Sequence, residues 1–219
     1  MNLNQRPITS LSLIGGQLCL DFVNTVGGRK YLLSADQTSD YVIVDEKITD
    51  YYDLLAWSQL TKSLPEDQIQ ELLESQQHEN ENKNKAIVKQ AVDLREAIYR
   101  ICKQIISKKE PNPLDIGILN QTLSIAYSHG ELVFIEGKFL WQWSKNSLDK
   151  ILWLIADSAA EFLTTTDLSR LHECGGVGCS WLFEDSSKNK MRQWCDMQTC
   201  GNLAKVRRFR SKSKEKTQQ

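Results

Sequence analysis

Four cysteines in the last quarter of the chain constrain its fold more than any other feature. They form two close pairs with the overall spacing C-x4-C-x15-C-x4-C. The residues are Cys174, Cys179, Cys195 and Cys200. Four thiolates suit tetrahedral zinc, and such a closed site is structural because no coordination position remains for water. The spacing therefore predicts one structural zinc ion, bound by these four side chains.

The sequence leaves other interpretations of the cysteines open. The four could be incidental buried thiols, or the site could be a redox switch, because zinc binds only deprotonated thiols and oxidation would release it. His172 lies two residues before Cys174 and could be a ligand, although four thiolates already complete the shell. Cys19 and Cys102 stand apart in apolar stretches, and we expect both to be small buried hydrophobic residues.

The charge of the chain is divided between its two parts. The whole chain has 27 basic and 28 acidic residues, but residues 168–219 contain 11 basic and 5 acidic ones, a balance of +6. Residues 1–167 contain 16 basic and 23 acidic ones, a balance of −7. Four thiolates with one zinc ion carry a charge of about −2, which leaves the tail at about +4. An acidic body with a basic tail is typical of proteins that contact nucleic acid or another anionic surface.

The basic side chains of the tail gather around the last two cysteines. We predict nucleic-acid contacts at Lys188, Lys190, Arg192, Lys205, Arg207, Arg208 and Arg210. A helix that begins near Cys200 would place Lys205 and Arg208 one turn apart on one side, with Leu203 on another. Such a cationic face can bind phosphates. The alternatives are that the tail binds a protein or that it is a purely structural module.

The body has the composition and the periodicity of a mainly helical globular domain. Hydrophobic residues make up 41% of the chain and charged residues 25%, which excludes a disordered or collagen-like protein. Apolar residues three and four positions apart predict helices over 48–64, 65–76, 86–107, 113–127 and 148–163. The polar stretch 78–85 predicts a loop. Residues 131–144 are rich in β-branched and aromatic types around Glu136 and Gly137, which predicts a β-hairpin.

We expect three parts in the chain. Residues 1–166 form a helical domain, residues 167–212 a zinc module, and residues 213–219 a disordered tail. The zinc module is too short to bury a large core, so zinc should contribute to its folding free energy. No apolar run approaches the ~18 residues needed to cross a bilayer, and the first residues lack the pattern of a signal peptide, so we expect a cytoplasmic protein.

Both ends of the chain resemble known domains. The stretch 174–210, CGGVGCSWLFEDSSKNKMRQWCDMQTCGNLAKVRRFR, resembles the CGNR zinc finger. The stretch 18–26, LCLDFVNTV, resembles the opening motif of the ABATE domain, which precedes this finger in bacterial proteins. The resemblance implies a stress-linked transcription regulator with a DNA-binding finger and a sensory or interaction domain. It also implies that the four cysteines are the zinc ligands, and that basic positions of the family fall on Arg192, Lys205, Arg207, Arg208 and Arg210.

Two positions depart from the pattern of the finger. Leu203 replaces the arginine of the CGNR tetrapeptide, and Gln193 replaces the second arginine of an Arg-Arg-Trp segment. If the missing arginines grip phosphate in the family, this chain should bind DNA more weakly or through other residues. If they brace the finger, Leu203 could pack in their place.

The opening motif has two possible structures and two possible roles. Residues 16–29 could alternate as a strand or form a short helix that ends at Gly27 and Gly28, and we favour the helix. Its polar residues Asp21, Asn24 and Arg29 could line a ligand pocket. Alternatively, Asp and Asn commonly satisfy nearby backbone groups at turns and caps.

These observations together predict a mainly α protein: a helical N-terminal domain with a β-hairpin, followed by a small treble-clef-like zinc module. We expect a DNA-binding transcriptional regulator whose body senses a small molecule or binds a partner, with a possible homodimer raising the affinity for DNA. The alternative is a zinc-stabilised protein-interaction adaptor with no direct DNA binding. We expect no enzymatic activity, since the sequence contains no nucleophile elbow, phosphate-binding glycine loop or His-x-x-x-His pair.

Overall fold

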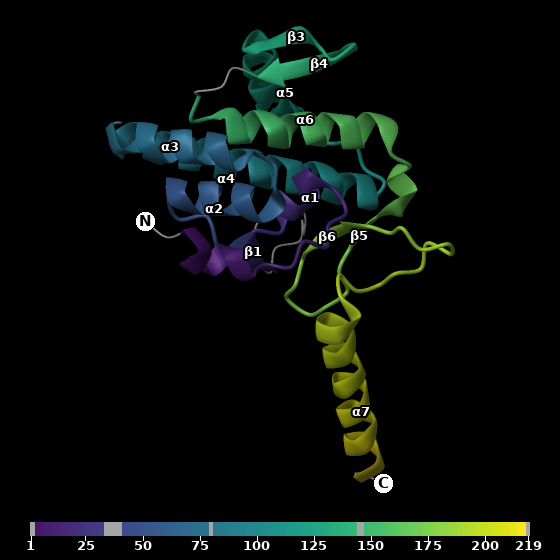
Figure 1. Cartoon of the computed structure of the whole chain (residues 1–219). Coiled ribbons are helices and arrows are strands. Elements are labelled where there is room, and N and C mark those ends of the chain that lie inside the picture. Colours follow the sequence, from purple (N-terminus) through teal and green to yellow (C-terminus); the bar gives the residue numbers. More distant parts are fainter. Residues whose placement is uncertain (1–2, 33–40, 79–80, 144–146, 218–219) are drawn as a thin grey trace.

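A helical body carries two β-hairpins and a zinc module with a projecting C-terminal helix (Figure 1). This arrangement comes from a computed structural model that describes residues 3–32, 41–78, 81–143 and 147–217. The helices of the body are α1 (Leu18–Val23), α2 (Tyr51–Thr61), α3 (Glu66–His78), α4 (Glu81–Ile106), α5 (Pro113–Ser128) and α6 (Lys150–Thr165). Two short 3-10 turns, η1 (Leu3–Gln5) and η2 (Pro7–Ser10), precede them.

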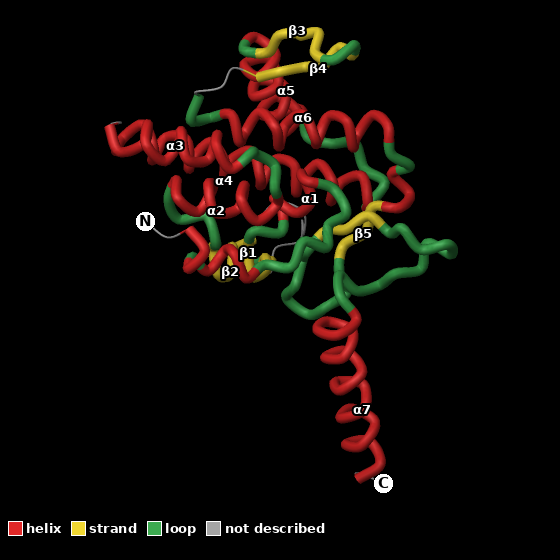
Figure 2. The backbone as a smooth tube through the Cα atoms, viewed as in Figure 1, coloured by secondary structure: helices red, strands yellow, loops and turns green. Residues whose placement is uncertain are grey.

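Each sheet in the described part of the chain is a two-stranded antiparallel hairpin (Figure 2). The strands are β1 (Val26–Tyr31) with β2 (Tyr41–Glu46), β3 (Gly130–Ile135) with β4 (Lys138–Trp143), and β5 (Leu171–Glu173) with β6 (Leu182–Glu184). The β5–β6 hairpin belongs to the zinc module, together with η3 (Leu168–Arg170), the π-helical turn η4 (Met197–Gly201) and α7 (Asn202–Thr217). The predicted fold class, mainly helical with a small zinc module, is confirmed.

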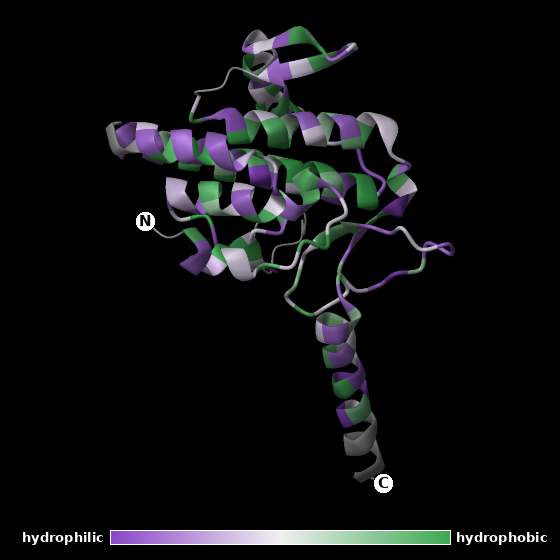
Figure 3. Cartoon of the chain, in the orientation of Figure 1, coloured by the Kyte–Doolittle hydropathy of each residue, from purple (hydrophilic) through white to green (hydrophobic). Residues whose placement is uncertain are grey.

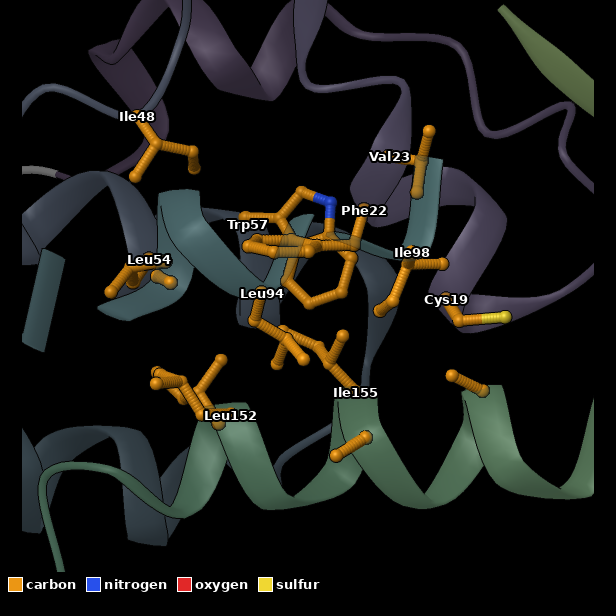
Figure 4. Close-up of a cluster of buried hydrophobic side chains, with 14 of the residues drawn as sticks. Cys19, Phe22, Val23, Ile48, Leu54, Trp57, Leu94, Ile98, Leu152 and Ile155 are labelled. Atoms are coloured by element: carbon orange, nitrogen blue, oxygen red, sulfur yellow. The ribbon is translucent and has the colours of Figure 1, made fainter. Parts of the chain in front are cut away.

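The core of the body lies between α1, α2, α4 and α6 (Figure 4). Phe22 of α1 and Trp57 of α2 meet edge to face, with ring centroids 5.0 Å apart. Leu94 from α4 and Ile155 from α6 are buried around them. Aromatic pairs of this geometry stabilise a core by about 0.5–1.5 kcal/mol beyond the area that they bury. Cys19 and Cys102 are free and fully buried, as predicted, and burial raises the pKa of Cys19 to about 12.

The boundaries of α2 follow local capping rather than the nearby Pro65. The first predicted helix is shorter than expected, because the Asp50 side chain caps the backbone N–H of Asp53 and α2 begins only at Tyr51. The helix ends where Lys62 adopts a left-handed conformation with φ 55°, three residues before Pro65.

The loop predicted over 78–85 is wrong at His78, which ends α3, and again from residue 81 onward. Helix α4 begins at Glu81, and Glu81 pairs with Lys85 one turn later at 2.8 Å. Asn84 is buried although it lies in this polar stretch. The stretch is polar because most of this turn faces solvent, not because the backbone leaves the helix. Residues 79–80 lie outside the described residues.

The opening motif contains both of the structures that its pattern allowed. Helix α1 ends at Val23, and strand β1 begins at Val26, so Gly27 and Gly28 lie inside a strand and do not end the helix. The hairpin that β1 forms with β2 was not predicted. The β3–β4 hairpin was, and its two-residue turn places Glu136 and Gly137 at positive φ, which matches the twist of the strands.

The last helix continues beyond the expected boundary of the ordered chain. Helix α7 runs to Thr217, so the segment from 213 that we predicted to be disordered is helical up to that residue. Within the described ranges, no helix combines the length and the apolarity that crossing a membrane requires.

Candidate zinc centre and nucleic-acid interface

The zinc module brings the four cysteines to one point. Cys174 directly follows β5, Cys179 precedes β6, Cys195 ends the next loop, and Cys200 lies in η4 just before α7. Their Sγ atoms all lie within 4.8 Å of one another, with Cys195 3.6 Å from both Cys179 and Cys200. Zn–S bonds of about 2.3 Å in a tetrahedron place sulfurs about 3.8 Å apart. The four side chains can therefore hold one zinc ion with no position left for water.

Backbone groups support the sulfur of Cys174. The N–H groups of Gly176 and Cys195 donate to its Sγ over 3.4 and 3.3 Å. Donors aimed at a thiolate favour its charged form. A Cβ at Gly176 would lie 2.9 Å from the Sγ of Cys200, so the tight loop requires glycine there. His172 is not part of the cluster; its ring packs against Phe183, with centroids 5.9 Å apart.

The predicted nucleic-acid residues fall into two groups. Two of them hold the finger together: Lys190 donates to Asp167 over 2.6 Å, and Arg192 donates to the carbonyls of Trp194 and Cys195. The guanidinium of Arg192 also lies 4.3 Å from the centre of the Phe183 ring. These two cations are therefore occupied by the fold of the finger itself.

Asp185 organises the loop that carries Lys188, Lys190 and Arg192. Its carboxylate is fully buried and accepts the backbone N–H groups of Ser187 and Arg192, both over 2.8 Å. Hydrogen bonds from Ser187 and Arg192 lower the pKa of Asp185 to about 2, so the side chain is ionised at neutral pH.

The second group of cations lies on α7, apart from Lys188, which is exposed on the loop. The α7 residues are Lys205, Arg207, Arg208 and Arg210. All four are exposed, and none forms an ion pair within the described part of the chain. Figure 1 shows α7 projecting away from the zinc module, and beyond its first two turns no other element of the described chain runs beside it. Hydrophilic and hydrophobic residues are interleaved along it (Figure 3).

Leu203, which replaces the family arginine, occupies the first turn of α7. It lines a cavity of about 270 Å³ together with Val177, Trp194 and Arg207. Its side chain is still exposed. Leu203 therefore lies beside the loop 174–179 that joins the first two cysteines, which we call the zinc loop, but it is not buried there.

The three polar residues of the opening motif have three different sets of partners. Asp21 accepts the backbone N–H of Gly15 over 2.7 Å, and burial raises its pKa. Asn24 hydrogen-bonds both backbone groups of Leu182, as donor and as acceptor, over 2.8 Å each. Arg29 forms a buried bidentate ion pair with Glu96 over 2.8 and 2.9 Å. The structure does not gather them around one ligand position, and a ligand stays a prediction.

Arg29 belongs to a buried charged network that the sequence pattern did not reveal. Arg95 is fully buried, donates to Glu46 over 2.6 Å, and contacts Glu96 over 2.7 Å. The hydroxyl of Tyr41 also donates to the carboxylate of Glu96. One feature of the sequence could have indicated the network. Arg95 lies on the apolar side of the helix predicted over 86–107, and a charged side chain buried there requires an ion-pair or hydrogen-bond partner.

The finger contacts the body through the opening motif, through α4 and through the hydrophobic core. The indole Nε1 of Trp181 donates to the carbonyl of Val26 over 2.7 Å, and Tyr99 of α4 donates to Glu173 over 2.8 Å. Leu171 and Leu182 of the finger belong to the main hydrophobic core of the body. These contacts place the zinc centre at a defined position on the body.

Comparison with known proteins identifies both parts of the chain. A family model described as the CGNR zinc finger matches residues 170–213. The ABATE family model, described as a putative stress-induced transcription regulator, matches residues 16–166. The comparison with curated proteins gave no match. The second match covers more than half of the chain, and together with the four-cysteine cluster it shows that this chain belongs to the ABATE family and carries a C-terminal CGNR zinc finger.

Proposed function

We propose that this chain is a cytoplasmic, stress-linked transcription regulator that binds duplex DNA through α7. The observation that carries the proposal is the set of exposed cations on α7, which have no acidic partner among the described residues, whereas Lys190 and Arg192 are occupied within the finger. Helix α7 has 16 residues and is therefore roughly 24 Å long. An α-helix of this kind fits the major groove, and basic side chains along it neutralise phosphates.

The roles of the two parts differ in this proposal. The zinc ion fixes the finger and performs no chemistry, because a closed four-thiolate site binds no water. The body acts as a sensory or partner-binding domain and has no enzymatic activity. In support, the buried carboxylate of Glu96 forms ion pairs with both Arg29 and Arg95, so these charged groups are used within the fold.

Fluorescence anisotropy of a labelled mixed-sequence duplex, titrated with the full zinc-loaded chain at several salt concentrations, tests the proposal. We expect binding that weakens steeply with salt. The double variant Arg207→Ala with Arg208→Ala should lower the slope of log K against log salt by roughly two, about one for each phosphate that an arginine no longer neutralises.

The matched control removes the same charge from the body. Lys85 and Lys89 are exposed on α4, so Lys85→Ala with Lys89→Ala should leave the salt slope unchanged. The proposal is wrong if the wild-type chain does not bind DNA at low salt, or if the α7 variant binds as the wild type does.

One observation favours the adaptor alternative. Leu203, Val206 and Phe209 are exposed at three-residue spacing on α7, and apolar side chains are uncommon on a helix that only contacts phosphate. In that case, Val206→Ser should weaken capture of a protein partner, while DNA should leave the NMR signals of the α7 amides unmoved.

A further inference from the structure

The β3–β4 hairpin exposes an apolar surface that the proposed function does not use. In the register of the hairpin, Leu132 lies opposite Trp141, and Phe134 lies opposite Phe139. Because side chains alternate along a strand, these four residues share one side of the hairpin, which we call the apolar face. Their exposed fractions are 62%, 64%, 68% and 44% for Leu132, Phe134, Phe139 and Trp141.

The base of the hairpin is held firmly by aromatic contacts. Tyr127 of α5 lies against Trp141 and Trp143, with ring centroids 5.6 and 5.5 Å apart. Trp143 in turn lies 6.3 Å from Trp153 of α6. The apolar face continues outward from this anchor, so its distal residues are presented on a supported hairpin.

No other strand covers the hairpin in the described part of the chain. A two-stranded hairpin is marginally stable in water unless its apolar side is packed. The four side chains of the apolar face expose roughly 500 Å², near the upper limit for the largest apolar patch of a monomer. With Tyr127, which is also exposed and lies against Trp141, two such faces together present roughly 1,200 Å², above the about 1,000 Å² that a biological interface needs.

The charges around the apolar face argue against a membrane or nucleic acid as the partner. Glu131 and Lys138 lie on the opposite side of the hairpin, because they alternate with Leu132 and Phe139. Residues 1–167 have a charge balance of −7, and anionic surfaces are recognised by clusters of lysine and arginine. The apolar face carries no such cluster, and an uncharged aromatic surface is best buried against another apolar protein surface.

We propose that two copies of this chain associate through their apolar faces as a two-fold symmetric homodimer. In such an interface the same patch meets itself, so Leu132 and the aromatic rings of one copy pack against those of the other. The hairpin lies at the end of the molecule opposite α7 (Figure 1), so the dimer leaves both α7 helices free. The proposal does not depend on whether α7 binds DNA.

Sedimentation equilibrium of the full zinc-loaded chain measures the association directly. We expect a mass of twice 25.1 kDa that falls toward 25.1 kDa on dilution. Phe139→Glu and Phe139→Lys each place a charge on the apolar face at its most exposed residue, and each should weaken the association roughly 30-fold or more. An equimolar mixture of the two should recover much of it, because the two copies then carry opposite charges in the interface, which attract where like charges repel.

The matched control is Leu114→Glu, which places the same charge on an exposed leucine at the start of α5, outside the apolar face. It should associate as the wild type does. The dimer is excluded if the wild-type chain has the mass of a monomer at every concentration, or if the Phe139 variants associate as tightly as the wild type.

A measurement on the wild-type chain is independent of whether the variants fold, since Phe139 also contacts Phe134 within its own hairpin. Hydrogen exchange at high and low concentration should show protection of the β3 and β4 amides that rises with concentration, and no change in α7. Protection that does not depend on concentration in β3 and β4 would overturn the proposal.

Discussion

Asn24 is nearly fully buried between α1 and β6, and its side-chain amide replaces a strand partner for Leu182. One oxygen and one nitrogen satisfy both backbone groups of a residue 158 positions away. The opening motif of the body therefore uses a polar side chain to hold the finger. Arg29 acts similarly within the body, where it satisfies the carboxylate of Glu96.

Replacing Asn24 with alanine should undock the finger. Asn24→Ala removes two buried hydrogen bonds and leaves the backbone of Leu182 unpaired, so the free energy of unfolding should fall by about 2–3 kcal/mol. Denaturation with urea measures the change. The matched control is Asn202→Ala, an exposed asparagine with one hydrogen bond to the carbonyl of Gln198, which should cost less than about 0.5 kcal/mol. Equal effects of the two substitutions would contradict the role assigned to Asn24.

The buried ion pairs predict a loss of stability in acid. Burial would raise the pKa of Glu96, but hydrogen bonds and charges from Arg29 and Arg95 outweigh it and lower the pKa from 4.5 to about 2. The ionised carboxylate therefore stabilises the fold above pH 4.5, and this contribution is lost as the pH falls toward 2. The loss should approach about 3 kcal/mol at most, because one pKa unit corresponds to about 1.4 kcal/mol.

Unfolding measured between pH 5 and 2.5 should show this slope in the wild type and a flatter one in Glu96→Gln. Release of zinc in acid is common to both proteins, so the difference between their slopes isolates Glu96. Glu71→Gln, at an exposed glutamate of α3, serves as the control and should keep the wild-type slope. Parallel slopes for the wild type and Glu96→Gln would show that the carboxylate does not stabilise the body in this way.

At the scale of elements, strand β1 lies against the zinc loop and requires a glycine. A Cβ at Gly28 would lie only 1.9 Å from the carbonyl oxygen of Gly178, between Cys174 and Cys179. The side chain is absent because two backbones approach closely, and not because the strand needs an unusual conformation. Strand β1 of the β1–β2 hairpin therefore packs directly against the zinc-binding part of the finger.

Gly28→Ala should push the zinc loop away from β1. We expect the free energy of unfolding to fall by about 2 kcal/mol or more and zinc to pass faster to a chromogenic chelator. Gly117→Ala is the matched control, because a Cβ there has no neighbour within 4 Å in the middle of α5. It should leave zinc release unchanged and stabilise the helix by up to about 1 kcal/mol. If Gly28→Ala retains zinc as firmly as this control, the close approach does not matter for the finger.

At the scale of the whole molecule, body and finger share one hydrophobic core. Leu171 and Leu182 of the finger belong to the core of the body, and Glu173 of β5 bonds to Tyr99 and Lys103 of α4. The boundary at residues 166–170 that separates the two family matches is therefore not a boundary of packing. Charge is divided between the parts, whereas the hydrophobic core is shared.

Removing zinc should consequently destabilise the whole chain. Calorimetry of the zinc-loaded protein should give a single unfolding transition, and treatment with a chelator should lower its midpoint temperature, because zinc binds the folded finger and the finger is coupled to the body. Adding zinc back should restore the midpoint. Two transitions, of which only one responds to the chelator, would show that the finger folds independently.

Local patterns determined much of this molecule from the sequence alone. The cysteine spacing predicted the zinc centre, apolar periodicity predicted the body helices, and the Glu136–Gly137 turn predicted the β3–β4 hairpin, because each depends on residues close together in the chain. The polar composition of residues 81–85 led to a wrong prediction of a loop, because this turn of α4 is helical but faces solvent. Only the tertiary structure decided which cations are free, what Asn24 and Gly28 contact, and that body and finger share a core. These properties depend on partners that lie far apart in the chain and meet only when the chain has folded.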